Sequence, residues 1–100
     1  MNSKLNILIA DDEPLARVRI REMLKNEDRA GLISEAANGD EAYQKTLELR
    51  PDIIFLDIQM PGCDGFQFLR NLKESHPDRM PIIIFVTAFD EYAIKAFEFY

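Results

Sequence analysis

The sequence predicts an α/β fold in which a parallel sheet carries helices on both faces. Continuous apolar runs, typical of strands buried on both faces, alternate with segments of helical periodicity. The alternation repeats four times, which calls for right-handed crossovers that cover the sheet. With 100 residues, of which 47% are hydrophobic and 30% charged, the chain suits one small globular domain.

The first expected strand covers residues 5–10 and ends at three consecutive acids, Asp11, Asp12 and Glu13. Pro14 suits the first turn of a following helix, because the N–H that proline lacks would have no partner there. The acids therefore lie between a strand and a helix. One interpretation makes them a solvated cap of that helix.

Helical spacing predicts that the helix after Pro14 packs an apolar face on the core. We expect this face to contain Leu15, Val18, Ile20, Met23 and Leu24. The arginines of the same helix are expected on its solvated side, or alternatively at a surface that docks a partner. They are Arg17, Arg19 and Arg21.

A weaker strand is expected at residues 32–36, near an edge of the sheet because it is less apolar. Asn38 and Gly39 indicate a turn, and Asp40 is expected to cap a helix that runs to Arg50.

The central strand is expected at residues 53–56, an unbroken apolar run that ends at Asp57. Pro61, Gly62 and Gly65 then turn the chain away from the sheet. Asp57 would sit at the carboxyl end of a central strand, where open α/β sheets bind their ligands. Alternatively, this aspartate merely ends a strand or caps a helix.

A third helix is expected after Gly65, and it frays before Pro77 because proline disfavours helical geometry in the preceding residue. A further strand is expected at residues 81–87, with Thr87 at its end. Asp90 opens a last predicted helix.

Three strand ends thus carry Asp11 with Asp12, Asp57 and Thr87. Parallel strands end at the same edge, so we expect these groups to converge in one cleft. Close carboxylates repel one another, and a cation relieves the repulsion. Oxygen ligands without histidine or thiolate favour a hard ion, and Mg²⁺ is the expected choice.

Composition narrows the function classes. The net charge of −6 argues against direct nucleic-acid binding and fits a cation or a basic partner. Cys63 is the sole cysteine, so the reducing cytoplasm is the expected compartment. Apolar runs stay well below the roughly 18 residues that would span a membrane, so no membrane association is expected.

The sequence resembles the receiver domain of bacterial two-component response regulators. The resemblance covers the whole chain and rests on Asp11-Asp12, on Leu56-Asp57-Ile58-Gln59-Met60-Pro61-Gly62 with Asp64-Gly65, and on Val86-Thr87-Ala88. Residues 11–17 and 85–93 are similar to the LytTR-type branch, whose receivers precede a DNA-binding domain. The family fold is a three-layer, flavodoxin-like, doubly wound sheet with strand order 2-1-3-4 for the strands expected here.

The resemblance implies a role for each site residue. Asp57 would accept a phosphoryl group from the phosphohistidine of a sensor histidine kinase in a phosphorelay. Asp11, Asp12 and Asp57 would hold Mg²⁺ together with the backbone carbonyl of Gln59. Thr87 would move its hydroxyl onto a phosphoryl oxygen and switch a transcription-regulating output domain. The domain would catalyse only its own phosphorylation and dephosphorylation.

The chain ends before the fifth strand, the fifth helix and the phosphoryl-pairing lysine of this family. Residues 1–100 are therefore expected to be a truncated receiver. The strand at residues 82–87 would then be an unpaired apolar edge, which favours a homodimer or a domain-swapped oligomer.

Two other functions stay open from the residues. One is an interaction module that keeps the fold and uses an aromatic last helix without phosphorylation. The other is a small Mg²⁺-dependent phosphohydrolase. Gln59 counts against the hydrolase, because it stands where hydrolases with an aspartate nucleophile usually carry a second acid.

Overall fold

Strands and helices alternate in the computed structural model, which describes residues 4–86 and leaves residues 1–3 and 87–100 outside the description. In order, the elements are β1 (Leu5–Ala10), α1 (Pro14–Leu24), β2 (Ala30–Ala36), α2 (Gly39–Leu49), β3 (Ile53–Leu56), α3 (Gly65–Ser75), a short 3-10 helix (Pro77–Arg79) and β4 (Ile82–Phe85). The predicted alternation is confirmed over this part of the chain. The expectations for Thr87 and for a helix from Asp90 fall outside it.

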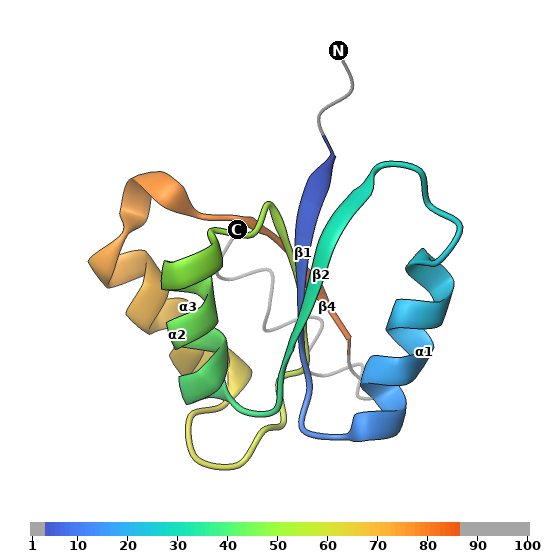
Figure 1. Cartoon of the computed structure of the whole chain (residues 1–100). Coiled ribbons are helices and arrows are strands. Elements are labelled where there is room, and N and C mark those ends of the chain that lie inside the picture. The colour runs from blue at the N-terminus through green and yellow to red at the C-terminus, as the bar shows by residue number, and fades with distance from the viewer. Residues whose placement is uncertain (1–3, 87–100) are drawn as a thin grey trace.

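The four strands form one parallel sheet in the order β2-β1-β3-β4. Helix α1 covers one face, and α2 and α3 cover the other, as Figure 1 shows. The sheet therefore lies between two helical layers, which confirms the predicted flavodoxin-like fold and strand order.

Apolar side chains of the central strands fill both faces of the sheet, because every second residue points to the same side. On the α2–α3 face the largest fully buried side chains are Leu8, Ile54, Leu56, Phe68, Leu69 and Leu72. On the α1 face the buried cluster is Ile7, Ile9 and Ile20. This two-sided burial explains the unbroken apolar runs at residues 7–10 of β1 and 53–56 of β3.

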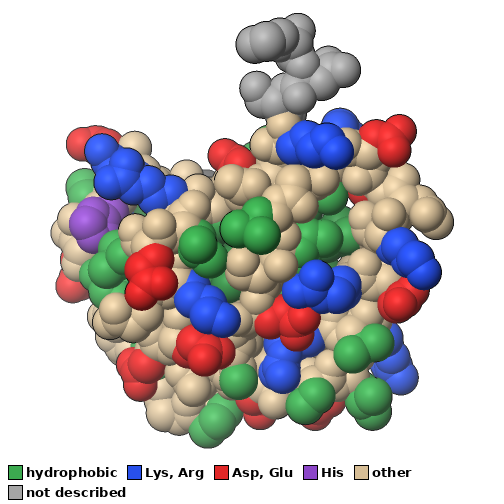
Figure 2. All heavy atoms as spheres, in the orientation of Figure 1, with side chains coloured by type: hydrophobic (Ala, Val, Ile, Leu, Met, Phe, Trp, Pro, Cys, Tyr) green, Lys and Arg blue, Asp and Glu red, His purple; other side chains and the backbone are tan. Residues whose placement is uncertain are grey.

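The prediction for the apolar face of α1 is wrong in part. Leu15, Val18 and Met23 are 71%, 52% and 73% exposed, while Ile20 is buried and Leu24 packs beside it. On the face drawn in Figure 2, hydrophobic side chains lie scattered among charged ones. The helix is rotated so that Arg17 and Arg21, not an apolar stripe, lie next to the buried positions along it.

The cap of α2 also differs from the prediction. The helix begins at Gly39, and its N-cap is Asn38, whose side chain accepts a hydrogen bond from the backbone N–H of Glu41 at 2.8 Å. Asp40 instead lies in the first turn, where a negative charge favours the helix dipole. Asn38 can take this role because its extended backbone turns the side chain back over the first turn.

The two outer strands differ from the central pair. Strand β2 is the edge strand that the sequence predicted, and it is longer than expected because it begins at Ala30. On β4, Ile82 and Ile84 are 63% and 40% exposed. Among residues 4–86, β4 pairs only with β3. None of the helices in these residues is long and apolar enough to cross a membrane.

Candidate metal centre

The backbone register brings the ends of β1 and β3 together. Ala10 lies opposite Leu56, so the residues that follow, Asp11 and Asp57, leave the sheet side by side. The N–H of Asp57 donates to the carbonyl of Ala10 at 2.9 Å. On the other side, the N–H of Asp11 donates to the carbonyl of Ala36 at 3.0 Å. These ladder hydrogen bonds hold both aspartates at the same edge of the sheet.

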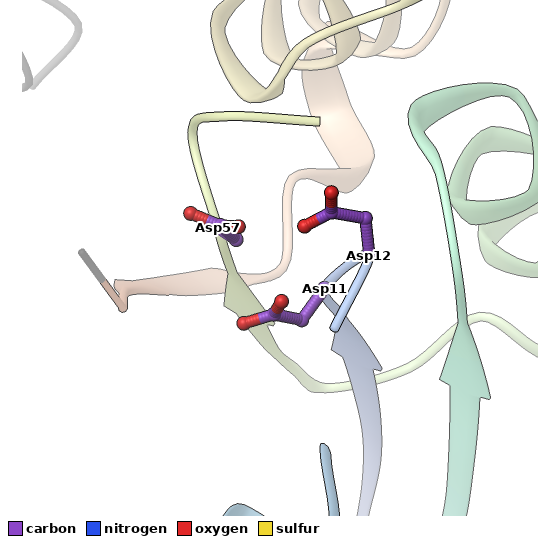
Figure 3. A group of neighbouring side chains, drawn as sticks. All are labelled: Asp11, Asp12 and Asp57. Atoms are coloured by element: carbon purple, nitrogen blue, oxygen red, sulfur yellow. The ribbon is translucent and has the colours of Figure 1, made fainter. Parts of the chain in front are cut away.

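Three carboxylates meet at this edge. Asp11, Asp12 and Asp57 each offer one oxygen, and these oxygens all lie within 4.8 Å of one another. Figure 3 shows the three side chains next to one another beyond the ends of the two strands. Asp11 is buried, Asp57 is half-buried and Asp12 is exposed. The structure therefore brings together the three acids that the sequence placed at one rim, and the cluster is more than a solvated helix cap.

Ionisation of the cluster is unfavourable in the absence of a cation. Burial, followed by the charge of Asp11, raises the pKa of Asp57 from 3.8 to about 6. Burial also raises the pKa of Asp11, and the hydrogen bond from the N–H of Glu13 at 2.9 Å opposes that rise. The site therefore has excess negative charge in a poorly hydrated position, which a bound cation would relieve.

The donor set fits a hard divalent cation. The grouped side chains supply only carboxylate oxygens, and Mg²⁺ prefers one or two carboxylates while it keeps water at its other positions. Because Asp12 is exposed and Asp57 is half-buried, the site is open on one side. A cation held there could contact a ligand that enters from solvent.

The segment between β3 and α3 forms the rest of the rim. The N–H of Gln59 donates to Oδ1 of Asp57 at 3.3 Å, and Gly62 turns the chain with a φ of +76°, which L side chains rarely adopt. At Gly65 the chain passes close to the end of β3. A Cβ at this position would lie 2.7 Å from the carbonyl oxygen of Asp57, so only glycine fits without a shift. Asp64 caps α3 by accepting a hydrogen bond from the N–H of Gln67.

A groove of about 660 Å³ opens beside the acids. Its lining residues are Asp12, Ile58, Gln59, Met60, Pro61, Asp64 and Phe66. It gives access to the carboxylates along the β3–α3 segment. Cys63 of the same segment is half-buried, and burial raises the pKa of its thiol, with the charges of Asp40 and Asp64 adding to the rise.

Thr87, the fourth expected member of the site, lies outside the described residues. The residue before it, Val86, donates its N–H to the carbonyl of Leu56 at 2.9 Å. Leu56 directly precedes Asp57 in the chain.

Sequence reasoning missed two residues that support the acids. Nη1 of Arg17 donates to the carbonyl oxygen of Asp11 at 2.6 Å, and Nε of Arg17 pairs with Glu35 at 2.9 Å. The signal was present, since Glu35 is a charge within a strand, and Arg17 and Arg21 stand one helical turn apart. The expectation of a solvated position is wrong for Arg17, whose side chain is 17% exposed and pairs with Glu35. Arg21 also pairs with Glu35, but its side chain is exposed as expected.

Comparisons with known proteins agree with this architecture. The transcriptional regulatory protein BtsR of Salmonella typhi is 49% identical over 94 residues, which cover 94% of this chain and 38% of that protein. BtsR of Escherichia coli strain K12 is 46% identical over the same length and coverage. The chain thus spans well under half the length of these curated relatives.

Solved structures give the same result. The REC domain of AraT, a response regulator from Geobacillus stearothermophilus, superposes with a TM-score of 0.78 at 34% identity, covering 96% of this chain and 75% of that one. The response regulator domain of Thermotoga maritima CheB gives 0.82 at 26% identity, covering 96% and 72%. The family model for the response regulator receiver domain matches residues 7–99. The chain therefore belongs to the response regulator receiver domain family.

Proposed function

We propose that this receiver accepts a phosphoryl group on Asp57 from the phosphohistidine of a sensor histidine kinase, in a reaction that needs Mg²⁺. The observation that carries the proposal is the approach of three carboxylates within 4.8 Å at the carboxyl ends of two parallel strands. A half-buried, electron-rich carboxylate beside a cation site has what phosphoryl transfer needs, which is a placed nucleophile and compensation of charge.

In the proposed reaction an Asp57 oxygen attacks the phosphorus, an O–P bond forms, and the N–P bond of the phosphohistidine breaks. Asp57 needs no general base, because with a pKa of about 6 it is mostly ionised at neutral pH. Asp11, Asp12, Asp57 and the backbone carbonyl of Gln59 would hold the Mg²⁺. When bound, the ion supplies positive charge to the phosphoryl oxygens.

We propose that Thr87 provides the switch. Its hydroxyl would donate to a phosphoryl oxygen, because a phosphoaspartate adds charge and acceptor oxygens that recruit a nearby donor. The hydrogen bond between Val86 and Leu56 supports this assignment by linking the residues that precede Thr87 and Asp57. The domain would then act as a signalling module that modifies only itself.

We further propose that the receiver controls a transcription-regulating output domain of the LytTR type and works in the cytoplasm. The similarity to BtsR, a transcriptional regulatory protein, supports this role. Residues 1–100 would form a single receiver domain. The exposed Ile82 and Ile84 on β4 support self-association as a dimer or a swapped oligomer. Neither the interaction module nor the phosphohydrolase gains support from a specific observation.

The test is phosphorylation by a small acyl phosphate donor with Mg²⁺, followed by intact mass and base lability. We expect one added phosphoryl group on the wild type and none on Asp57→Asn. Asp28→Asn is the matched control, because it removes the same charge from an exposed position away from the site. Label that survives in Asp57→Asn would refute the assignment of the acceptor. Label that forms equally in excess EDTA would refute the role of Mg²⁺.

A further inference from the structure

Arg17 joins helix α1 to the acid cluster through a backbone carbonyl of that cluster and through Glu35. Its Nη1 donates to the backbone carbonyl of Asp11 at 2.6 Å, and its Nε donates to Oε1 of Glu35 at 2.9 Å. The side chain is 17% exposed although it belongs to an otherwise solvated stretch of helix. One guanidinium therefore spans α1, the end of β1 and β2.

Glu35 is itself held from several sides. Arg21 pairs with its other oxygen, Oε2, at 2.8 Å, and Arg21 also donates to the carbonyl of Ile33 at 3.1 Å. Lys45 of α2 donates to the backbone carbonyl of Glu35. These contacts connect all the elements around β2, and they leave Glu35 little freedom to turn away from Arg17. Figure 2 shows basic and acidic side chains next to one another over this part of the surface.

The carbonyl that Arg17 binds has a special place in the chain. It belongs to the peptide unit that joins Asp11 to Asp12, and a peptide unit is planar, so its orientation sets the direction in which both residues leave it. The Asp11 N–H is already bound to Ala36, and the Asp11 carboxylate accepts from the N–H of Glu13. Arg17 adds the hydrogen bond to the backbone carbonyl of Asp11, so the N–H, the carbonyl and the carboxylate of Asp11 are all held.

We propose that Arg17 is a positioning residue that holds the Asp11–Asp12 peptide in the orientation needed for divalent cation binding. This inference rests on the proposed metal site. In this arrangement Glu35 holds the guanidinium of Arg17 in place. Hydrogen-bonded partners of metal ligands commonly change metal affinity by about 10-fold to 100-fold when they are removed.

The geometry of the guanidinium explains why an arginine stands here. Its planar fork directs Nε and Nη1 to two acceptors at once, while the ammonium of a lysine is a compact charge on a flexible stem. Arg17→Lys therefore keeps the charge and loses one of the two contacts. Arg21 offers a matched control, because it pairs with the same Glu35 but makes no contact with the Asp11–Asp12 turn.

If Arg17 is removed, its charge and its positioning hydrogen bond would change the affinity for a cation in opposite directions. Removing a positive charge near the acids would by itself strengthen the binding of a cation. Loss of the hydrogen bond to the Asp11 carbonyl would weaken it. A weaker affinity in Arg17→Ala is therefore a signature of positioning that a simple charge effect does not produce.

The experiment measures Mn²⁺ affinity by the electron paramagnetic resonance signal of free Mn²⁺, with Mg²⁺ as competitor, on the full chain. We expect affinity to fall by about tenfold in Arg17→Ala, to fall less in Arg17→Lys, and to stay within about twofold of the wild type in Arg21→Ala. Unchanged or tighter binding in Arg17→Ala, or an equal loss in Arg21→Ala, would overturn the inference.

A second measurement needs no metal and keeps the inference distinct from the proposed function. Amide hydrogen exchange in EDTA should become faster at the N–H of Glu13 in Arg17→Ala and Arg17→Lys, but not in Arg21→Ala, because this N–H binds the Asp11 side chain. Equal exchange in all variants would overturn the inference even if Asp57 is phosphorylated. Conversely, a wild type that binds Mn²⁺ but takes no phosphoryl group would refute the proposed function. The positioning role of Arg17 would then still be tested by the Mn²⁺ affinities of the variants. A wild type that binds no Mn²⁺ would refute both.

Discussion

Replacing Asp57 by asparagine should stabilise the metal-free protein at neutral pH. In the folded chain the ionised form of this carboxylate is unfavourable, because burial and the charge of Asp11 raise its pKa to about 6. In the unfolded chain the group ionises near its ordinary value of 3.8. An amide of the same shape carries no charge, so it avoids the unfavourable ionisation at the rim.

The size of the effect follows from the difference between the two pKa values. The difference between 3.8 and about 6 corresponds to about 3 kcal/mol of unfavourable free energy for the ionised form in the folded chain. The carboxylate is half-buried rather than fully buried, so solvent screens part of this, and we expect a gain of about 1–2 kcal/mol in Asp57→Asn.

The contribution of Asp57 to the unfolding free energy also changes with pH. Between about pH 4 and about pH 6 the folded chain holds the Asp57 proton more tightly than the unfolded chain does, so the unfolding free energy falls as pH rises. This stabilising contribution is complete below the unfolded pKa and is lost as pH rises through the folded pKa. The advantage of Asp57→Asn over the wild type should therefore grow across this window.

The assay is urea unfolding in EDTA, followed by circular dichroism, at about pH 4 and about pH 7.5 for both proteins. The unfolding free energy of the variant relative to wild type should be larger by about 1–2 kcal/mol at the higher pH. Asp28→Asn, which removes an exposed charge, should show no such growth. A variant that is equally stable or less stable relative to wild type at the higher pH would refute the account of an electrostatically strained cluster.

Three further results are expected. Mg²⁺ at about 100 times its dissociation constant should raise the unfolding free energy of the wild type by about 2.7 kcal/mol, as measured by scanning calorimetry. This rise should vanish in Asp57→Asn, and in the wild type it should shrink below about pH 6 as Asp57 gains its proton. Gly39→Ala should cost about 1–3 kcal/mol in urea unfolding, because the new Cβ would lie 2.0 Å from the carbonyl oxygen of Cys63 and would push the β3–α3 segment away; wild-type stability would contradict the close approach of the two segments. Phe68→Ala should cost about 3–5 kcal/mol, because this ring is fully buried between α3 and the sheet; a loss below about 1 kcal/mol would mean that the face is not packed as described.

Strands could be predicted closely because their signal is local. The runs before Asp11 and Asp57 are apolar without interruption, and buried parallel strands are among the few structures that need such runs. The helices between the strands require a parallel arrangement, and parallel strands place these acids at one edge of the sheet. The clustering of Asp11, Asp12 and Asp57 is therefore a consequence of strand order and direction.

Helix faces were predicted less well, because periodicity alone leaves the rotation of a helix open. In α1 one stripe carries Leu15 and Val18, while the neighbouring stripe carries Ile20 with Arg17 and Arg21. Glu35 on β2 favours the rotation that turns the second stripe toward the sheet, because it forms ion pairs with Arg17 and Arg21. That choice depends on which strand lies under the helix, and spacing within the helix does not report it.

By itself, the sequence determined which parts of residues 4–86 form the four strands and three α-helices, that the strands run parallel, and which acids follow β1 and β3. Each of these depends on local composition and on chain connectivity. Only the tertiary structure decided how α1 is rotated, that Asn38 caps α2, and that Arg17 holds the carbonyl of Asp11. Those features depend on contacts between residues far apart in the chain, and their energies arise only once the sheet has assembled.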